Sequence, residues 1–328
     1  MRVLVTGGAG YVGSHCVAEL RRAGHEPVVF EDLSAGLRRS IGDFAFVQGD
    51  LGDEARVLAA LKESRAEAVM HFAASASVGE SVEQPEKYYF NNVVNALGLL
   101  RAMRNGGVDR FVFSSSCTIY GVPDRVPITE DQPARPVSPY GRTKVAIEGI
   151  LADYAVAYGL KYASLRYFNA SGAAPDGSLG EDHDPETHLI PLAVFAAMGK
   201  RDSISVFGTD YPTPDGTCVR DYIHVCDLAS AHVMAMEALD ERRAMVYNLS
   251  TGRGHSVREV IEMVGQVSGR AVRTIEAARR PGDPAVLVGS PEKVRAELGW
   301  EPRYPALRTI VEDAWAWHSA HPDGYADR

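Results

Sequence analysis

Short apolar runs alternate with amphipathic stretches through the first half of the chain. The runs have the length and the β-branched content of strands, and they lie at Val3–Thr6, Pro27–Glu31, Ala45–Gln48, Ala68–Phe72, Arg110–Ser114 and Tyr162–Tyr167. Apolar residues recur at helical spacing between them, at Gly13–Ala23, Glu54–Ser64, Pro85–Asn105 and Pro139–Tyr158. This alternation predicts a parallel sheet with helices on both faces. The nearly continuous apolar character of the strands is typical of strands buried on both sides.

The pattern changes after Asn169. A stretch rich in Gly, Pro and Asp at 173–177 precedes a predicted helix at Leu189–Gly199, and a second polar loop runs from Gly208 to Gly216. Long polar loops in a compact protein are usually functional or disordered. The segment 221–248 again has a strand, helix, strand pattern, and we expect it to return to the main sheet.

Three glycines separate the first predicted strand from the first predicted helix. They permit a tight turn, close approach of the backbone to a pyrophosphate and close packing of helix on strand, while the helix N-terminus offers free N–H groups. The strand before and the helix after the turn favour dinucleotide binding over a plain glycine-rich turn. The candidate contacts here are Gly7, Gly10, Tyr11, Val12 and Gly13. The fold class predicted is α/β, a Rossmann-type doubly wound parallel sheet with a smaller mixed α/β C-terminal substrate domain.

Two acids, Glu31 and Asp32, follow the second predicted strand. An acid about 20 residues past the glycines accepts hydrogen bonds from ribose hydroxyls and repels the extra phosphate of NADP, so NAD is the expected cofactor. Arg38 and Arg39 lie close enough in sequence to keep NADP open. Asp50-Leu51, after the third strand, either flanks the adenine or provides an aspartate cap for the next helix.

Composition excludes several classes of function. The chain has 43 acidic and 34 basic residues, a net charge of -9 and no basic run, so a nucleic-acid role lacks its electrostatic basis. No apolar stretch approaches the ~20 residues of a membrane helix. The start runs directly into a strand without an export signal, so we expect a cytoplasmic protein. The four cysteines form no C-x-x-C pair, which predicts small buried side chains, no disulfide framework and no metal site.

The candidate chemical centre is Tyr140 and Lys144, four residues apart on one face of a predicted helix. An ammonium near a tyrosine favours the phenolate and makes it a usable base at neutral pH. The lysine can also reach the ribose of the nicotinamide. Ser116 follows a buried strand, at the carboxyl edge where ligands bind in this architecture, and is a natural proton relay to Tyr140. Each feature alone is compatible with surface packing or a strand-end turn; their chain order together with the glycine motif favours catalysis.

These residues carry a resemblance to the UDP-glucose 4-epimerase family, within the extended short-chain dehydrogenase/reductase superfamily, over essentially the whole chain. The most specific parts are Arg166–Asn169 and Val219–His224. The other similar stretches are Gly7–Gly13, Val78–Ser81, Tyr88–Asn92, Ser114–Gly121, Ser138–Lys144 and Arg280–Asp283.

The resemblance implies reversible epimerisation at carbon 4 of UDP-glucose and UDP-galactose through a 4-keto intermediate, with tightly bound NAD. Tyr140 would act as base and acid, Lys144 as its electrostatic partner and Ser116 as relay. Further implied cofactor contacts are Phe72, Ala73, Ala74, Asn91, Ser114 and Tyr167. Implied substrate contacts are Asn169, His188, Leu189, Phe207 near the uracil, Arg220, Tyr222, Arg280, Asp283 and Leu287. Arginine suits this work because its planar fork grips phosphate through two bonds; ion pairing within a loop is the alternative role for Arg220 and Arg280.

The resemblance also implies a division of the chain. Residues 1–168 plus about 221–248 would form the NAD-binding domain, and about 169–220 plus 249–328 the UDP-sugar-binding domain. Pro85–Asn105 and Pro139–Tyr158 would pair with a second copy in a homodimer, although their apolar stripes could equally be core.

Three positions depart from the best-known bacterial pattern. Ala76 replaces a lysine that contacts cofactor phosphates, His188 replaces an asparagine of the substrate loop, and Leu287 replaces a tyrosine that excludes N-acetylated sugars. The last change raises the hypothesis that UDP-N-acetylglucosamine is accepted.

Two alternatives stay open. One is a 4-epimerase of another UDP-sugar, of N-acetyl, pentose or uronic acid form; a 4,6-dehydratase is disfavoured because Ser116–Tyr120 lacks the acidic pair that elimination needs. The other is a noncatalytic dinucleotide-sensing regulator, since a fold does not determine a function.

Overall fold

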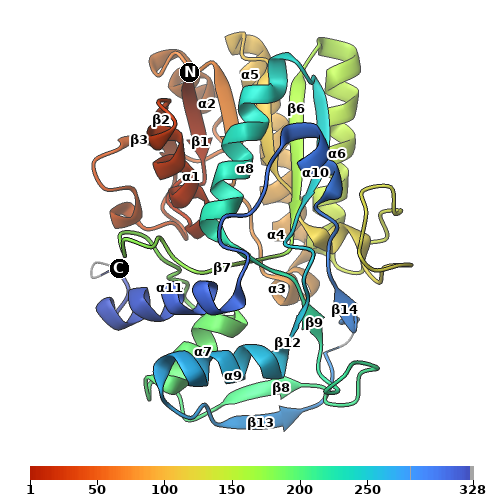
Figure 1. The fold of residues 1–328 in the computed structure, drawn as a ribbon. Coiled ribbons are helices and arrows are strands. Elements are labelled where there is room, and N and C mark those ends of the chain that lie inside the picture. Colours follow the sequence, from red (N-terminus) through yellow and green to blue (C-terminus); the bar gives the residue numbers. More distant parts are fainter. Residues whose placement is uncertain (281, 326–328) are drawn as a thin grey trace.

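A seven-stranded parallel sheet forms the centre of the computed structural model, which describes residues 1–280 and 282–325 (Figure 1). Its strand order is β3-β2-β1-β4-β5-β6-β11. The strands are β1 (Arg2–Thr6), β2 (Glu26–Glu31), β3 (Ala45–Gln48), β4 (Ala68–His71), β5 (Arg110–Ser114), β6 (Lys161–Tyr167) and β11 (Ala244–Leu249). The six strands predicted in the first half of the chain are confirmed. The order reverses between β1 and β4, which creates the switch point where ligands bind in such sheets.

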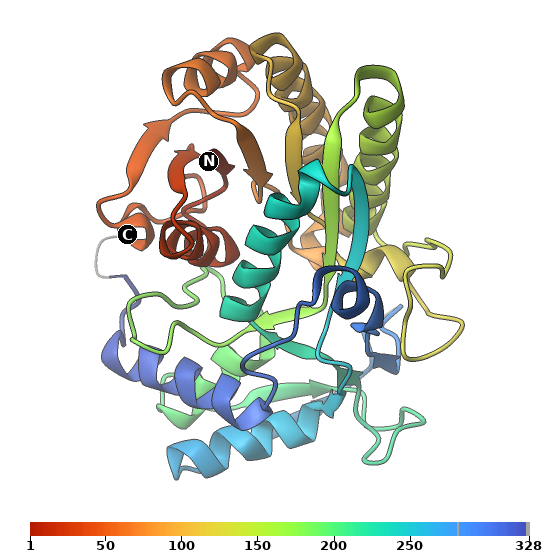
Figure 2. The ribbon, with the colours of Figure 1, turned by 45° about the horizontal axis from the view of Figure 1, so that its top comes forward.

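Helices cover both faces of this sheet (Figures 1 and 2). α1 (Tyr11–Arg22) and α8 (Val225–Glu237) pack side by side on one face, and α2 (Glu54–Glu63), α5 (Asn95–Gly106) and α6 (Pro139–Tyr158) lie on the other. The alternation of side chains along β1 shows how two cores arise. Val3 and Val5 join the core under α1 and α8, whereas Leu4 joins the core on the opposite face.

The predicted helix Pro85–Asn105 is confirmed as a continuous helical stretch, but its middle is π-helical rather than α-helical. After α3 (Val78–Glu83), it divides into α4 (Pro85–Tyr88), a π-helical turn η2 (Tyr89–Val94) and α5. The wide turn lies where Asn92 is fully buried, and its Nδ2 donates to Ser75 O at 3.0 Å and to Thr143 Oγ1 at 3.2 Å. Such turns often occur at functional sites. Here the turn ties the loop after β4 to α6.

Smaller sheets and a separate core make up the second part of the molecule. β10 (Tyr222–His224) pairs with β7 (Asn169–Ser171), so the expectation that 221–248 returns to the main sheet holds for α8 and β11 but not for β10. The reason is packing, because Tyr222 belongs to the core of the second part. The other strands here are β8 (Ile204–Phe207) with β13 (Thr274–Ala277), and β9 (Val219–Arg220) between β12 (His255–Ser256) and β14 (Val286–Leu287).

The helices of this second part share one apolar core with β8 and β10. They are α7 (Leu189–Ala197), α9 (Val257–Ser268) and α11 (Leu307–Ala320), while α10 (Glu292–Leu298) packs on β11. Short turns of 3₁₀ helix complete the chain at η1 (Arg38–Ile41), η3 (Cys117–Tyr120) and η4 (Ala238–Asp240). Residues 326–328 of the expected second domain lie outside the described residues.

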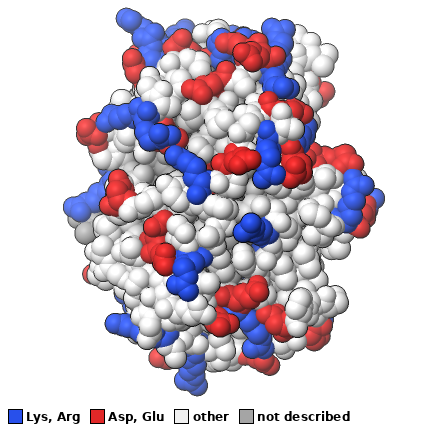
Figure 3. Space-filling model, viewed as in Figure 1, with Lys and Arg blue, Asp and Glu red and all other residues white. Residues whose placement is uncertain are grey.

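Charges of both signs are interspersed on the surface, as Figure 3 shows for one face. Within residues 1–280 and 282–325, every helix falls short of the length and apolar character that crossing a bilayer requires. The four cysteines are free thiols; Cys16, Cys117 and Cys218 are buried as predicted, whereas Cys226 is partly exposed.

Candidate active site

The glycine turn after β1 has room only for glycine at two positions. Gly7 has φ +71°, and a Cβ there would lie 2.3 Å from the backbone N of Ala73. A Cβ on Gly13 would lie 2.2 Å from the carbonyl oxygen of Gly7. Gly10 is the N-cap of α1 and brings no side chain to its first N–H groups, with Tyr11 and Val12 directly after it. The turn therefore presents an uncapped helix N-terminus that fits a dinucleotide phosphate.

Glu31 closes β2 beside this turn. Its Oε2 accepts a hydrogen bond from Ala9 N–H at 3.3 Å, and burial raises the pKa of its carboxyl to about 7. Asp32 is exposed and accepts both the N–H and the hydroxyl of Ser34. Arg38 donates to Gly42 O at 2.8 Å and lies over the Phe46 ring. An acid in this place fits the ribose of NAD. The contacts of Arg38 are within its own turn, so they give no support to the binding of the extra phosphate of NADP.

In the loop after β3, the aspartate that caps α2 is not the one expected. Asp53, not Asp50, is the N-cap and accepts from Arg56 N–H. Asp50 instead accepts from Gly52 N–H at 2.8 Å. The capping alternative for Asp50 is therefore wrong. Asp50 is exposed and Leu51 half-buried.

Tyr140 and Lys144 lie on the first two turns of α6, over the carboxyl end of β5. Ser138 caps this helix through Gly141 N–H, and Pro139 occupies its first position. Lys144 Nζ donates to Ser114 O at 2.7 Å and lies 5.6 Å from the centroid of the Tyr140 ring. Both side chains are buried, with Tyr140 8% and Lys144 2% exposed.

Burial dominates the protonation of this pair. It raises the pKa of Tyr140 well above the usual value, and a hydrogen bond with the Ser116 hydroxyl offsets only part of this. Burial also lowers the pKa of Lys144 to about 7, although the Glu148 carboxylate acts in the opposite direction. The apoprotein therefore favours a neutral phenol next to an amine that titrates near neutrality.

The remaining cofactor candidates surround the same edge of the sheet. Ser114 Oγ and Tyr167 OH share a hydrogen bond of 2.8 Å, which places the ends of β5 and β6 together. Phe72 follows β4 and its ring lies 4.9 Å from that of His232, with Ala73 and Ala74 half-buried beside it. Asn91 Nδ2 donates to Ser75 Oγ at 3.2 Å.

The substrate candidates gather at β9, β14 and the end of β8. Arg220 is 12% exposed and pairs with Asp283, while Leu287 lies opposite it in the strand register. The guanidinium of Arg280 lies 4.1 Å from the ring centroid of Phe207. Asn169 donates its side-chain amide to Asp221 O at 3.0 Å, which leaves its amide oxygen for another partner. Arg220 therefore forms the ion pair that was the alternative to phosphate binding. Arg280 instead contacts an aromatic ring.

Three candidates point elsewhere. Tyr222 is packed in the core of the second part. Tyr11 OH donates to Gly172 O at 2.7 Å. His188 is the N-cap of α7, and Leu189 is the first residue of that helix. The Nδ1 atom of His188 faces the carboxylates of Glu181 and Glu186. Although burial opposes the imidazolium, these carboxylates outweigh it and hold the pKa of His188 well above its usual range.

Residues 3–250 match the NAD dependent epimerase/dehydratase family. The chain belongs to this family. It is 50% identical to a UDP-glucose 4-epimerase of Corynebacterium glutamicum, over 98% of this chain and 97% of that one. The UDP-glucose 4-epimerase of Brucella ovis in complex with NAD is 52% identical, with a TM-score of 0.94 and coverage of 96% and 97%. That of Bifidobacterium longum in complex with NAD+ and UDP is 38% identical, with a TM-score of 0.95 and coverage of 99% and 100%.

In this member of the family, a buried polar network that the sequence did not reveal supports Ser114–Ser116 from behind. Glu148 accepts from Ser115 Oγ at 2.6 Å and from Arg166 Nε at 3.0 Å. Arg166 also donates to Tyr120 OH, which donates to Asn248 Oδ1 at 2.7 Å. The four-residue spacing from Lys144 to Glu148 places both side chains on one face of a helix and was the one sign of this network in the sequence. The partner of Glu148 is Arg166, which is distant in sequence and could not be predicted. The network fixes the strand end below the candidate catalytic serine.

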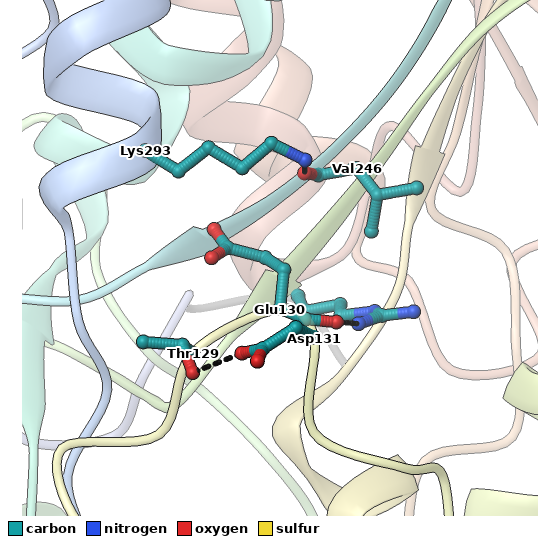
Figure 4. Close-up of a pocket in the computed structure, with 6 residues that line it drawn as sticks. Thr129, Glu130, Asp131, Val246 and Lys293 are labelled. Carbon is teal, nitrogen blue, oxygen red and sulfur yellow. Dashed lines mark hydrogen bonds between the residues drawn. The ribbon is translucent and has the colours of Figure 1, made fainter.

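A surface pocket of about 470 Å³ lies at this network (Figure 4). It is lined by Thr129, Glu130, Asp131, Arg166, Val246 and Lys293. Lys293 Nζ donates to Val246 O at 3.0 Å. The glycine turn and Tyr140 are not among its lining residues, so we do not assign the family's chemistry to this pocket.

Proposed function

We propose that the protein interconverts UDP-glucose and UDP-galactose by oxidising and re-reducing carbon 4 of the sugar with retained NAD. The observation that carries this proposal is the hydrogen bond from Lys144 Nζ to Ser114 O, which holds the ammonium beside Tyr140 at the same sheet edge as the glycine turn. The family membership and the similarity to NAD-bound epimerases support it.

The chemistry rests on a proton transfer in each direction. NAD supplies a reversible hydride acceptor and, in its oxidised form, a positive charge that favours phenolate at Tyr140. Tyr140 takes the proton of the 4-hydroxyl, with Ser116 as relay, while carbon 4 loses a hydride. Tyr140 then returns the proton when the opposite face of the 4-keto sugar is reduced. Lys144 holds the ribose side of the site and tunes the phenol.

The nucleotide end anchors the substrate during this cycle. We assign the diphosphate to Arg220 and Arg280, the uracil to Phe207, and further contacts to Asn169 and Asp283. Guanidinium groups suit a diphosphate because they form bidentate bonds. Strong holding of the nucleotide and weak holding of the hexose let the keto sugar rotate and present its other face. The cofactor ends in its starting state, so no external NAD is consumed.

A second candidate substrate is UDP-N-acetylglucosamine. Leu287 lies opposite Arg220 in the strand register and packs against the small apolar cluster that includes Cys117 and Phe168. It is smaller than tyrosine and leaves more space beside the hexose. Similar turnover of both sugars supports this extension, whereas a large preference for the plain hexose excludes it and leaves the main proposal intact.

We also propose a homodimer. α3 and the π-helical turn next to α6 expose a row of large apolar side chains, Val82 at 64%, Phe90 at 60% and Val94 at 50%. α3 and η2 both pack against α6, so these side chains lie beside that helix, and large exposed apolar patches mark protein interfaces. We retain two further proposals from the sequence: the two-domain division, and a cytoplasmic location, which the free thiols support.

The decisive experiment follows the anomeric proton NMR signals of UDP-galactose with purified protein and no added cofactor. A stable mixture with UDP-glucose is expected. An unchanged spectrum, even after NAD is added, contradicts the proposal and directs attention to pentose, uronic acid and N-acetyl forms, and then to a dinucleotide-sensing regulator.

A further inference from the structure

Two glutamates and two histidines converge in the loop between β7 and α7. One ligand-type atom from each of Glu181, His183, Glu186 and His188 lies within 4.8 Å of the others. His188 Nδ1 is 2.6 Å from Glu181 Oε1 and 3.2 Å from Glu186 Oε1. His183 Nδ1 is 3.2 Å from Glu181 Oε1 and 3.7 Å from Glu186 Oε2. Four bonds of about 2.0–2.2 Å to one ion place tetrahedral ligand atoms roughly 3.3–3.6 Å apart, which is close to these separations.

Two carboxylate oxygens in this group have no hydrogen-bond donor outside the group among the described residues. Glu181 is 3% exposed, and its Oε1 meets the two imidazoles and no other donor within the described part of the chain. Glu186 Oε1 accepts from the backbone N–H groups of Thr187 and His188, at 2.6 and 2.7 Å. Its Oε2 is buried and, among the described residues, accepts no hydrogen bond. The loop therefore brings two anionic oxygens and two imidazole nitrogens together in one buried group, whose ligand-type atoms face one another.

We propose that Glu181, His183, Glu186 and His188 bind one divalent transition-metal cation, with Zn²⁺ as the representative ion. Imidazole nitrogen and carboxylate oxygen are ligands that zinc accepts, and four protein ligands are typical of a structural site. When the two imidazoles give up their protons to bind the ion, two carboxylates and a dication leave the buried group without net charge. The side chain of His188 is 54% exposed, which gives the ion a path from solvent. The signal for this site in the sequence is the close spacing of two glutamates and two histidines within 181–188, whereas the absence of a metal site was predicted from cysteines alone.

The metal would fasten the loop next to the glycine turn. The His183 ring meets the ring of Tyr11, the first residue of α1, edge to face at 6.1 Å. On the other side, Gly180 N–H donates to Tyr325 OH at 3.0 Å, and Asp182 accepts from Tyr325 N–H at 2.9 Å. The ion would therefore link the loop, the start of the dinucleotide helix and the end of α11. This inference is independent of the proposed function, since a metal-binding loop requires no catalysis.

The test measures metal binding directly. Tag-free protein is stripped with a chelator, dialysed, and titrated with Zn²⁺ by calorimetry, with bound metal counted by mass spectrometry. One ion per chain and a rise in the melting temperature are expected. Co²⁺ is used as a second probe, and visible absorption typical of four-coordinate Co²⁺ is expected. Uptake of less than a tenth of an ion per chain would overturn the proposal.

Matched variants locate the ion. His183→Gln should weaken Zn²⁺ binding at least 10-fold, while His255→Gln, a histidine of β12, should leave it unchanged. Glu186→Gln keeps an acceptor for the Thr187 and His188 amides but removes the anionic oxygen, so it should weaken binding with little effect on the fold. If His183→Gln and Glu186→Gln bind Zn²⁺ as tightly as the parent protein and the His255→Gln control, the ion lies elsewhere and the proposal is wrong.

Discussion

The ammonium of Lys144 donates a hydrogen bond to the backbone carbonyl of Ser114 at 2.7 Å, across 30 residues of sequence. This bond joins α6 to the end of β5 and sets the position of the lysine relative to Tyr140. It also uses one of only three donors of the ammonium, so two remain for a ribose and other partners.

Replacing Tyr140 with phenylalanine should lower kcat by about 10²–10⁴-fold, because general acid-base catalysis has that usual magnitude. The ring packing against Tyr88 would be retained, so NAD content and melting temperature should stay the same. Tyr158→Phe, at the exposed end of the same helix, serves as control. A loss of less than tenfold would reject the role.

Lys144 should make the apoprotein more stable as the pH rises. Its pKa is about 7 in the folded state, whereas the ordinary pKa of a lysine is 10.5. Between these values the unfolded chain binds more protons than the folded one, so the free energy of unfolding increases with pH, by at most about 1.4 kcal/mol per pH unit. The destabilisation is fully present below pH 7. Urea unfolding at several pH values should show this slope, and Lys144→Met should reduce it; equal slopes would contradict the assignment.

The ion pair of Glu148 and Arg166 should be worth far more than a surface pair. Both side chains are 12% exposed, and removing one partner of a buried pair costs roughly 3–5 kcal/mol. Glu148→Ala should therefore lower the free energy of unfolding by about 3 kcal/mol. Glu63→Ala removes an exposed partner of Arg56 and should change it by less than about 1 kcal/mol. Denaturant unfolding of both variants distinguishes the cases, and equal effects would argue against a buried pair.

A methyl group in the glycine turn should prevent dinucleotide binding. The Cβ of Gly13→Ala would lie 2.2 Å from Gly7 O, so α1 would have to move away from the turn. We expect at least a tenfold weaker NAD affinity, measured by cofactor content and by calorimetry. Gly149→Ala, where a Cβ meets no atom within 4 Å, is the control. Equal NAD affinity in both variants would show that the turn does not hold the cofactor.

A charge at the exposed apolar row should separate the subunits. Phe90 is 60% exposed in the single chain, and Phe90→Glu would bury a carboxylate in the proposed interface, which is strongly unfavourable. Light scattering should give twice the chain mass for the parent protein and a single chain mass for the variant. Val156→Glu, on α6 at 91% exposure, is a second variant, because α6 is the other helix expected in the interface. A single chain mass for the parent protein would contradict the proposed homodimer.

Features that depend on neighbouring residues could be predicted from the amino-acid sequence. The strands of the first half, the glycine turn and the spacing from Tyr140 to Lys144 follow from local steric and periodic rules. Hydrophobic alternation and glycine geometry act over a few residues, so they are visible before folding. For this reason the sheet and the main candidate residues were predicted close to where they lie.

Contacts between groups that are distant in sequence became visible only in the folded chain. Glu148 needs Arg166 from another element, the π-helical turn depends on the burial of Asn92, and β10 leaves the main sheet because Tyr222 packs in another core. The convergence of Glu181 and His188 is likewise a property of how the loop closes. Each such contact sets the cost of removing polar groups from water against the gain from pairing them with a partner distant in sequence. Whether that partner is in reach depends on the whole fold rather than on any local pattern.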